Sequence, residues 1–140
     1  MNILVAVELI REVDEEIIGR ALDVAQGCDA NLHLVHVVDT TGEYGVTSPH
    51  MLVDIIEEHE ANARKQINEL GTAFDIPQEN QFVVVGLVRE VIADLLKIID
   101  ADLLVVGNHG RHGFDALFHW NNTVSLAKHT DCDMLAVRVA

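Results

Sequence analysis

Residues 102–113 read Asp-Leu-Leu-Val-Val-Gly-Asn-His-Gly-Arg-His-Gly, an apolar run followed at once by a glycine-rich segment. The four consecutive apolar residues, 103–106, are typical of a strand buried on both faces of a parallel sheet. The three glycines that follow have no side chain, so the backbone there can approach a ligand closely. The stretch therefore predicts a buried parallel strand that ends at a candidate binding loop.

Short apolar runs alternate with segments of helical periodicity through the rest of the chain. This alternation predicts an α/β fold, an open doubly wound sheet of five parallel strands with helices on both faces. Residues 39–49 have no apolar period and are predicted as a loop. No shift in composition marks a boundary, so residues 1–140 are predicted to form one domain. Strands are predicted at residues 2–7, 31–37, 81–85, 102–106 and 133–139, and helices at 14–26, 50–72, 88–99 and 121–129.

Composition and charge argue against several classes of protein. The formal net charge of −14, with no basic patch, disfavours binding to nucleic acids and to anionic membranes. No apolar run approaches the roughly 20 residues of a spanning helix, and the N-terminus lacks a basic leader, so we expect a cytoplasmic protein. Cys28 and Cys132 do not form a CxxC pair, and we expect both to be reduced and packed as small hydrophobic residues.

The candidate binding site lies beyond the carboxyl ends of two strands. In open doubly wound sheets, ligands bind there, at the point where the strand order reverses. The first strand ends at Val7 and Glu8, and the fourth runs into Gly107. The N–H groups of this loop could cradle a phosphate, and Arg111 could add a charge-assisted contact. The segment is neither a GxGxxG nor a Walker sequence, so the residues alone leave phosphate binding and a simple turn both open.

The histidines argue only weakly for a metal site. His109, His112 and His119 are close in sequence, but no cysteine completes a structural zinc set. His33 and His36 lie three apart in a predicted strand, so they face opposite sides of the sheet. We therefore expect no metal site.

Five segments together carry a family resemblance that covers essentially the whole chain. They are residues 3–8 (Ile-Leu-Val-Ala-Val-Glu), 34–37 (Leu-Val-His-Val), 86–92 (Gly-Leu-Val-Arg-Glu-Val-Ile), 102–113 and 132–137 (Cys-Asp-Met-Leu-Ala-Val). The chain resembles the universal stress protein family, most specifically in the glycine loop and the closing strand. The resemblance implies the strand order 3-2-1-4-5, which places the switch point between the first and fourth strands.

Many members of that family bind ATP through the pattern G-x-x-G, nine residues, then Gly-Ser or Gly-Thr. Gly107 and Gly110 match the first half, whereas Trp120-Asn121 stands where the second half is expected. A tryptophan brings a large side chain and restricts the backbone where glycine would approach the phosphates. We therefore expect Trp120 to fill the phosphate space and adenine nucleotide binding to be weak or lost. Glu8 stands where the family usually has Asp.

The resemblance also assigns roles to further residues of the candidate site. It implies that the backbone of Val37 meets the adenine and that Gly107 and Gly110 contact the ribose and phosphates. Asn121 would donate a hydrogen bond in place of the family's serine. The implied cofactor is ATP or AMP with Mg²⁺. The expected site consists of Ala6, Glu8, Val37, Gly107, Asn108, His109, Gly110, Arg111, Asn121 and Asn122.

The function expected from these residues is that of a non-enzymatic cytosolic stress-response regulator. We expect a homodimer, paired through the edge strand 133–139 with its alternating apolar residues, and an unidentified regulatory protein as a further partner. No catalytic residue is expected, because neither Ser48 nor Ser125 lies in a nucleophile elbow. The alternative is an ATP- or AMP-binding sensor with at most slow ATP hydrolysis. A third hypothesis is an enzyme or electron-transfer subunit of a related α/β fold, although a flavin or adenylating enzyme would normally need a longer chain or a second domain.

Overall fold

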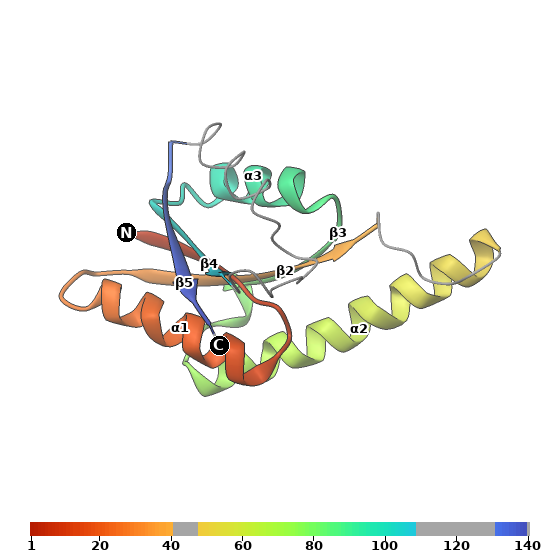
Figure 1. Ribbon diagram of the computed structural model, residues 1–140, viewed down its shortest axis with the longest axis horizontal. Helices are drawn as coiled ribbons and strands as arrows, with labels where there is room; N and C mark the ends of the chain where they lie inside the picture. The colour runs from red at the N-terminus through yellow and green to blue at the C-terminus, as the bar shows by residue number, and fades with distance from the viewer. Residues whose placement is uncertain (41–47, 109–130, 140) are drawn as a thin grey trace.

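The structure is a computed structural model that describes residues 1–40, 48–108 and 131–139. At its centre lies a sheet of five parallel strands in the order β3-β2-β1-β4-β5 (Figure 1). The predicted α/β fold and strand order are confirmed. The strands are β1 (Asn2–Ala6), β2 (Asn31–Asp39), β3 (Gln81–Gly86), β4 (Leu103–Asn108) and β5 (Asp133–Arg138), and the described helices are α1 (Arg11–Ala25), α2 (Pro49–Ala73), the 3-10 turn η1 (Gln78–Asn80) and α3 (Val88–Ile98).

Helices cover both faces of the sheet (Figure 1). Helices α1 and α2 pack on one face, and α3 packs on the other. The side chains of β1 alternate between these layers, with Ile3 and Val5 on the α1–α2 side and Leu4 and Ala6 on the α3 side. All four side chains are at most 1% exposed. Because both faces of the central strands are covered, their sequences are almost continuously apolar.

The element boundaries differ from the predicted ones by a few residues. Helix α1 begins at Arg11, three residues before its predicted start, and β2 continues to Asp39, two residues past its predicted end. Strand β4 likewise extends to Asn108, so the first two residues of the predicted glycine loop belong to the sheet. The predicted helix at 121–129 and most of the predicted loop at 39–49 lie outside the described residues.

Local sequence explains where α2 begins and ends. Pro49 occupies the first turn, where backbone N–H groups make no intrahelical hydrogen bond, so the lack of an N–H on proline costs nothing there. The Ser48 hydroxyl accepts a hydrogen bond (3.2 Å) from a backbone N–H of that turn. At the other end Asp75 adopts a left-handed φ of 57°, and the N–H of Ile76 donates to the Gly71 carbonyl at 2.8 Å. This is a Schellman cap, which satisfies carbonyls that the helix leaves without partners.

The expectation that both cysteines pack as small hydrophobic residues is wrong for Cys28. Cys28 is exposed, because it follows the left-handed Gly27 (φ 83°) just past the end of α1, where the chain turns at the surface. Cys132 is half-buried beside β5, and both thiols are free.

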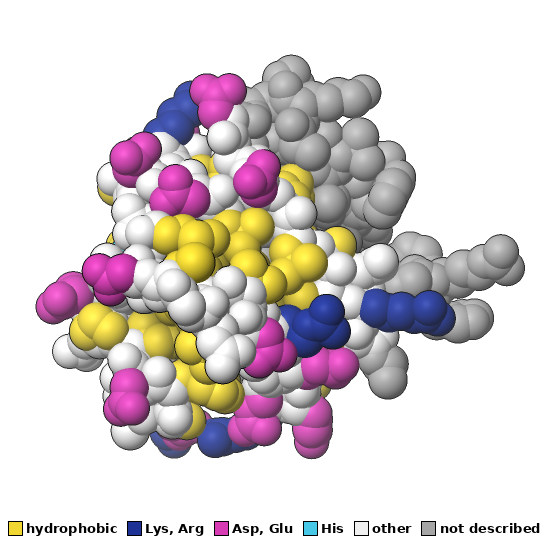
Figure 2. Space-filling model, turned by 90° about the vertical axis from the view of Figure 1, so that its left-hand side faces the viewer, with side chains coloured by type: hydrophobic (Ala, Val, Ile, Leu, Met, Phe, Trp, Pro, Cys, Tyr) yellow, Lys and Arg dark blue, Asp and Glu magenta, His cyan; other side chains and the backbone are white. Residues whose placement is uncertain are grey.

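The surface reflects the acidic composition. Figure 2 shows one face on which hydrophobic side chains gather near the centre, with Asp and Glu side chains spread around them. This distribution accords with the formal net charge of −14. None of the helices in residues 1–40, 48–108 and 131–139 is long and apolar enough to cross a membrane.

Candidate functional site

The carboxyl ends of β1 and β4 lie side by side at the centre of the sheet. The two strands pair in parallel, with Val5 opposite Val105, and the strand order reverses between them. Glu8 lies two residues past the end of β1, and Gly107 and Asn108 are the last two residues of β4. The fold therefore brings together the two segments at which the sequence predicted a ligand site.

Glu8 and Gly107 are in close contact. A Cβ atom at Gly107 would lie 2.5 Å from Glu8 Oε2 and 2.9 Å from Ile17 Cδ1, both closer than real Cβ contacts allow. The glycine therefore makes room for the carboxylate of Glu8, which lies against the backbone of β4. An oxygen ligand in this position suits a hard cation such as Mg²⁺, and a carboxylate here adds negative charge where a phosphate would approach.

The turn from β1 into α1 holds Glu8 in place. The Glu8 N–H donates a hydrogen bond to Asp14 Oδ1 at 2.7 Å, and the Asp14 side chain is only 1% exposed. Leu9 adopts a left-handed φ of 64° between them. That conformation is unfavourable for a leucine by about 1–2 kcal/mol, and strained residues of this kind cluster at functional sites.

Sequence reasoning did not identify Asp14 and Leu9 as parts of this site. Asp14 lies in the first turn of α1, where an acidic residue is common because of the helix dipole, so its presence is no distinctive signal. Nothing in a leucine indicates positive φ. The hydrogen bond from Glu8 to Asp14 spans six residues and depends on the turn that Leu9 makes.

The residue predicted to meet the adenine, Val37, and its neighbour in the predicted site, Ala6, keep their side chains in the core. Val37 is 2% exposed and Ala6 is 1% exposed, and both side chains pack in the layer against α3. Only their main chains can face a ligand at the strand ends. Asn108 is half-buried, and its carbonyl accepts a hydrogen bond from the Val139 N–H at 3.0 Å. The other predicted site residues, His109, Gly110, Arg111, Asn121 and Asn122, lie outside the described residues.

The two histidines of β2 face opposite layers, as their spacing predicts. His33 stacks on Phe82 with ring centroids 6.3 Å apart, on the α3 side of the sheet. His36 is 3% exposed and faces α2, where its Nε2 lies 3.4 Å from Nε2 of His59. Within the part of the chain that the structure describes, no group of three or more His, Cys, Asp or Glu residues is placed to hold a metal ion.

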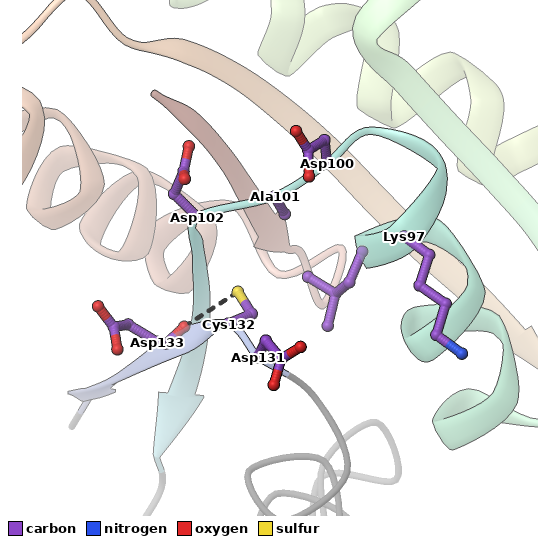
Figure 3. A pocket seen from close by; sticks show the side chains of 8 residues that line it. Lys97, Asp100, Ala101, Asp102, Asp131, Cys132 and Asp133 are labelled. Atoms are coloured by element: carbon purple, nitrogen blue, oxygen red, sulfur yellow. Dashed lines mark hydrogen bonds between the residues drawn. The ribbon is translucent and has the colours of Figure 1, made fainter.

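A hollow lies at the opposite end of the sheet, beside the start of β5 (Figure 3). It has a volume of about 440 Å³. Burial, followed by the charges of Asp133 and Asp102, raises the pKa of the Cys132 thiol. The thiol is therefore a poor nucleophile, and the carboxylates disfavour an anionic ligand. The hollow is lined by Leu96, Lys97, Asp100, Ala101, Asp102, Asp131, Cys132 and Asp133.

Comparison with known proteins identifies the family. The sequence profile of the universal stress protein family matches residues 1–138, nearly the whole chain. The chain belongs to the universal stress protein family. The family membership predicted from the five sequence segments is thus confirmed.

Two kinds of relative accompany this family match. Universal stress protein A homolog 1 of Coxiella burnetii is 34% identical over 141 residues, which cover 97% of this chain and 94% of the relative. Among solved structures, the universal stress protein UspA of Lactobacillus plantarum superposes with a TM-score of 0.72 at 21% identity, covering 99% and 97% of the two chains. A universal stress protein solved in complex with cAMP has a TM-score of 0.64 at 20% identity, covering 100% and 98%. The structural likenesses show a shared fold.

Proposed function

We propose that this universal stress protein is a non-enzymatic regulator that acts in the cytoplasm as a homodimer and binds adenine nucleotides weakly. The observation that carries the proposal is the contact between Glu8 and Gly107. Glu8 Oε2 lies 2.5 Å from where a Cβ of Gly107 would be, against the first glycine of the family's nucleotide motif. The space that a phosphate would approach therefore already holds an anionic side chain.

Charge and size both act against nucleotide binding here. The family usually has Asp at this position, and the extra methylene of Glu8 lets its carboxylate extend over Gly107. Two negative groups about 4 Å apart repel by about 1 kcal/mol even at the dielectric constant of water, and by more near a protein surface. The net charge of −14 adds to this repulsion. Mg²⁺ coordinated by the Glu8 carboxylate would reverse the effect, so any residual ATP binding depends on Mg²⁺.

The sequence beyond β4 also disfavours nucleotide binding. Trp120 and Asn121 replace the Gly-Ser of the family motif, so the second phosphate-binding element lacks its glycine. The alternative function, an adenine nucleotide sensor, is supported by the retained Gly107 and Gly110 and by the related universal stress protein solved with cAMP. The two proposals differ in one quantity, the affinity for adenine nucleotide.

The surroundings of one candidate nucleophile support a role without catalysis. The hydroxyl oxygen of Ser48 accepts a hydrogen bond from a backbone N–H as the N-cap of α2, which is a structural role. Among the described residues, the hydroxyl of Ser48 is paired with a backbone N–H, whereas a nucleophile needs an adjacent general base. We propose that the protein acts through a regulatory protein partner.

The homodimer is proposed through β5, at one edge of the sheet. Within residues 1–40, 48–108 and 131–139 the sheet has no strand beyond β5, and Met134 and Leu135 of this strand are only half-buried. Such an edge pairs readily with another strand, and antiparallel pairing about a two-fold axis would cover it. Light scattering should give twice the 15.4 kDa mass of the chain. A monomer at tens of micromolar would contradict the dimer.

Analysis of the purified protein tests the nucleotide part of the proposal. The protein is purified without added nucleotide, denatured, and its supernatant analysed by chromatography for ATP, ADP, AMP and cAMP. We expect far less than one nucleotide per chain and no ATP hydrolysis above a buffer control. Stoichiometric nucleotide would instead support the sensor, and stoichiometric ADP with turnover of added ATP would support a slow ATPase.

A further inference from the structure

His36 and His59 come from separate elements and meet through their ring nitrogens. His36 lies near the carboxyl end of β2, and His59 lies on α2, which covers that face of the sheet. Their Nε2 atoms are 3.4 Å apart, and the ring centroids are 5.5 Å apart with a 42° tilt. The Nε2 atoms of the two rings therefore face each other. We propose that His36 and His59 form a binding site for a divalent transition-metal ion, with Zn²⁺ as the probe.

The tautomer of His36 suits a metal ligand. His36 Nδ1 lies 3.1 Å from the carbonyl oxygen of Val7, which can only accept a hydrogen bond. Nδ1 therefore carries the proton in this contact, and Nε2 presents its lone pair toward His59. Metal-binding histidines characteristically donate their second ring N–H to a carbonyl or carboxylate in this way, which fixes the ring and increases its basicity.

The spacing of the two nitrogens matches the edge of a coordination tetrahedron. Zn–N bonds of about 2.0–2.1 Å at the tetrahedral angle place two nitrogens about 3.3–3.4 Å apart. The observed separation of 3.4 Å falls at that value. It is long for a hydrogen bond between two ring nitrogens, so the direct contact that a metal would replace is weak.

The position of the pair lets an ion enter from solvent and determines which elements a bound ion would join. His59 is half-buried, so an ion can reach the pair from solvent, whereas His36 is 3% exposed and held by the carbonyl of Val7, just past the end of β1. Water would fill the remaining coordination positions, because no group of three or more ligating side chains is assembled among the described residues. A bound ion would join α2 to the strand ends beside Glu8 and so stiffen the edge of the candidate site.

The sequence did not indicate this site because its ligands come from different elements. The expectation of no metal site considered the spacing within β2, where His33 and His36 face opposite layers. The partner of His36 is instead 23 residues further along the chain, on a helix. Neutral imidazoles of this kind favour Cu²⁺, Ni²⁺ and Zn²⁺ over Mg²⁺, so the pair is chemically distinct from an oxygen site for Mg²⁺ at Glu8.

The experiment is Zn²⁺ titration of the metal-stripped protein at pH 7.5, by competition with a chromophoric chelator, on the wild type and on His59→Gln. His50→Gln is the matched control, because His50 is exposed on the same helix. A variant with His109, His112 and His119 all changed to Gln tests whether histidines outside the described residues bind the Zn²⁺. We expect His59→Gln to weaken Zn²⁺ binding on the order of 10–100-fold and both controls to leave it unchanged.

Two further readouts make the result independent of folding. Zn²⁺ should raise the melting temperature of the wild type and of His50→Gln but not of His59→Gln. Circular dichroism verifies that His59→Gln is folded, which we expect because the side chain it replaces is only half-buried. Zn²⁺ affinity should also fall as the solution is acidified, because a protonated imidazole cannot coordinate a metal ion. Equal Zn²⁺ affinity in the wild type and in folded His59→Gln would overturn the proposal, as would loss of binding in the triple variant alone.

Discussion

At the amino ends of β1 and β4 the polar groups bind one another, whereas at the carboxyl ends of the same strands a carboxylate lies against a glycine. The Asn2 N–H donates to Asp102 Oδ2 and the Asp102 N–H donates to the Asn2 carbonyl, both at 2.8 Å. The Asn2 amide also donates to the Ile99 carbonyl at 2.9 Å. These hydrogen bonds satisfy the polar groups at the amino ends of the two strands. The other end has a glycine, a strained turn at Leu9 and the Glu8 carboxylate instead, so the two ends should respond differently to mutation.

The largest effect is expected at the carboxyl end. Gly107→Ala places a Cβ against Glu8 and Ile17, so it should lower the free energy of unfolding by about 1–3 kcal/mol. In a Glu8→Ala background the same change should cost less, because one of the two obstructing side chains is gone. Chemical denaturation of the four proteins of this double-mutant cycle measures the coupling.

Gly19→Ala is the matched control for this cycle. A Cβ at Gly19 would meet nothing within 4 Å, and the residue lies inside α1, so alanine there should stabilise by about 0.5–1 kcal/mol. If Gly107→Ala costs as much without Glu8 as with it, then the carboxylate is not what the glycine accommodates.

A smaller loss is expected at the amino end. Asp102→Ala removes the acceptor of the Asn2 N–H and should cost about 1 kcal/mol, with no change in nucleotide affinity. Asp131→Ala, in the same acidic hollow, removes a carboxylate that repels its neighbours and should be neutral or slightly stabilising. An altered ATP affinity in Asp102→Ala would break the distinction between the two ends.

The smallest effect concerns Cys132 and pH. Because the pKa of this thiol is raised in the folded protein, its contribution to stability is complete below the ordinary thiol pKa and is lost as the pH rises through the folded value. Iodoacetamide at pH 8 should therefore modify exposed Cys28 several-fold faster than Cys132. Mass spectrometry of the two peptides over time reports the ratio, and faster labelling of Cys132 would contradict the account.

The parts of the fold that follow from local pattern were predictable, and those that follow from distant contacts were not. Continuous apolar runs such as residues 103–106 indicate a strand covered on both faces, and the family resemblance orders the strands. Glu8 and Gly107 were predicted to lie together because parallel strand ends meet at a switch point. The hydrogen bond from Glu8 to Asp14 depends on a leucine in a left-handed conformation, which nothing in its side chain favours.

The misjudged cysteine and the histidine pair show the same limit. Cys28 was expected in the core because of its residue type, but its place directly after Gly27 at a helix end decides its exposure. The contact between His36 and His59 arises only once α2 packs across β2, and periodicity within either element contains no information about it. Local sequence specifies elements and faces, and tertiary packing determines which side chains meet.

Calorimetric titration with ATP measures whether Glu8 and Trp120 weaken nucleotide binding. The proteins are the wild type, the double variant Trp120→Gly with Asn121→Ser, and the same variant with Glu8→Asp added, each with Mg²⁺ and with EDTA. We predict that the wild type binds more weakly than about 1 mM, or about −4 kcal/mol, and that the triple variant with Mg²⁺ binds at least tenfold more tightly than the double. Micromolar binding by the wild type would contradict the account and identify the protein as a nucleotide sensor.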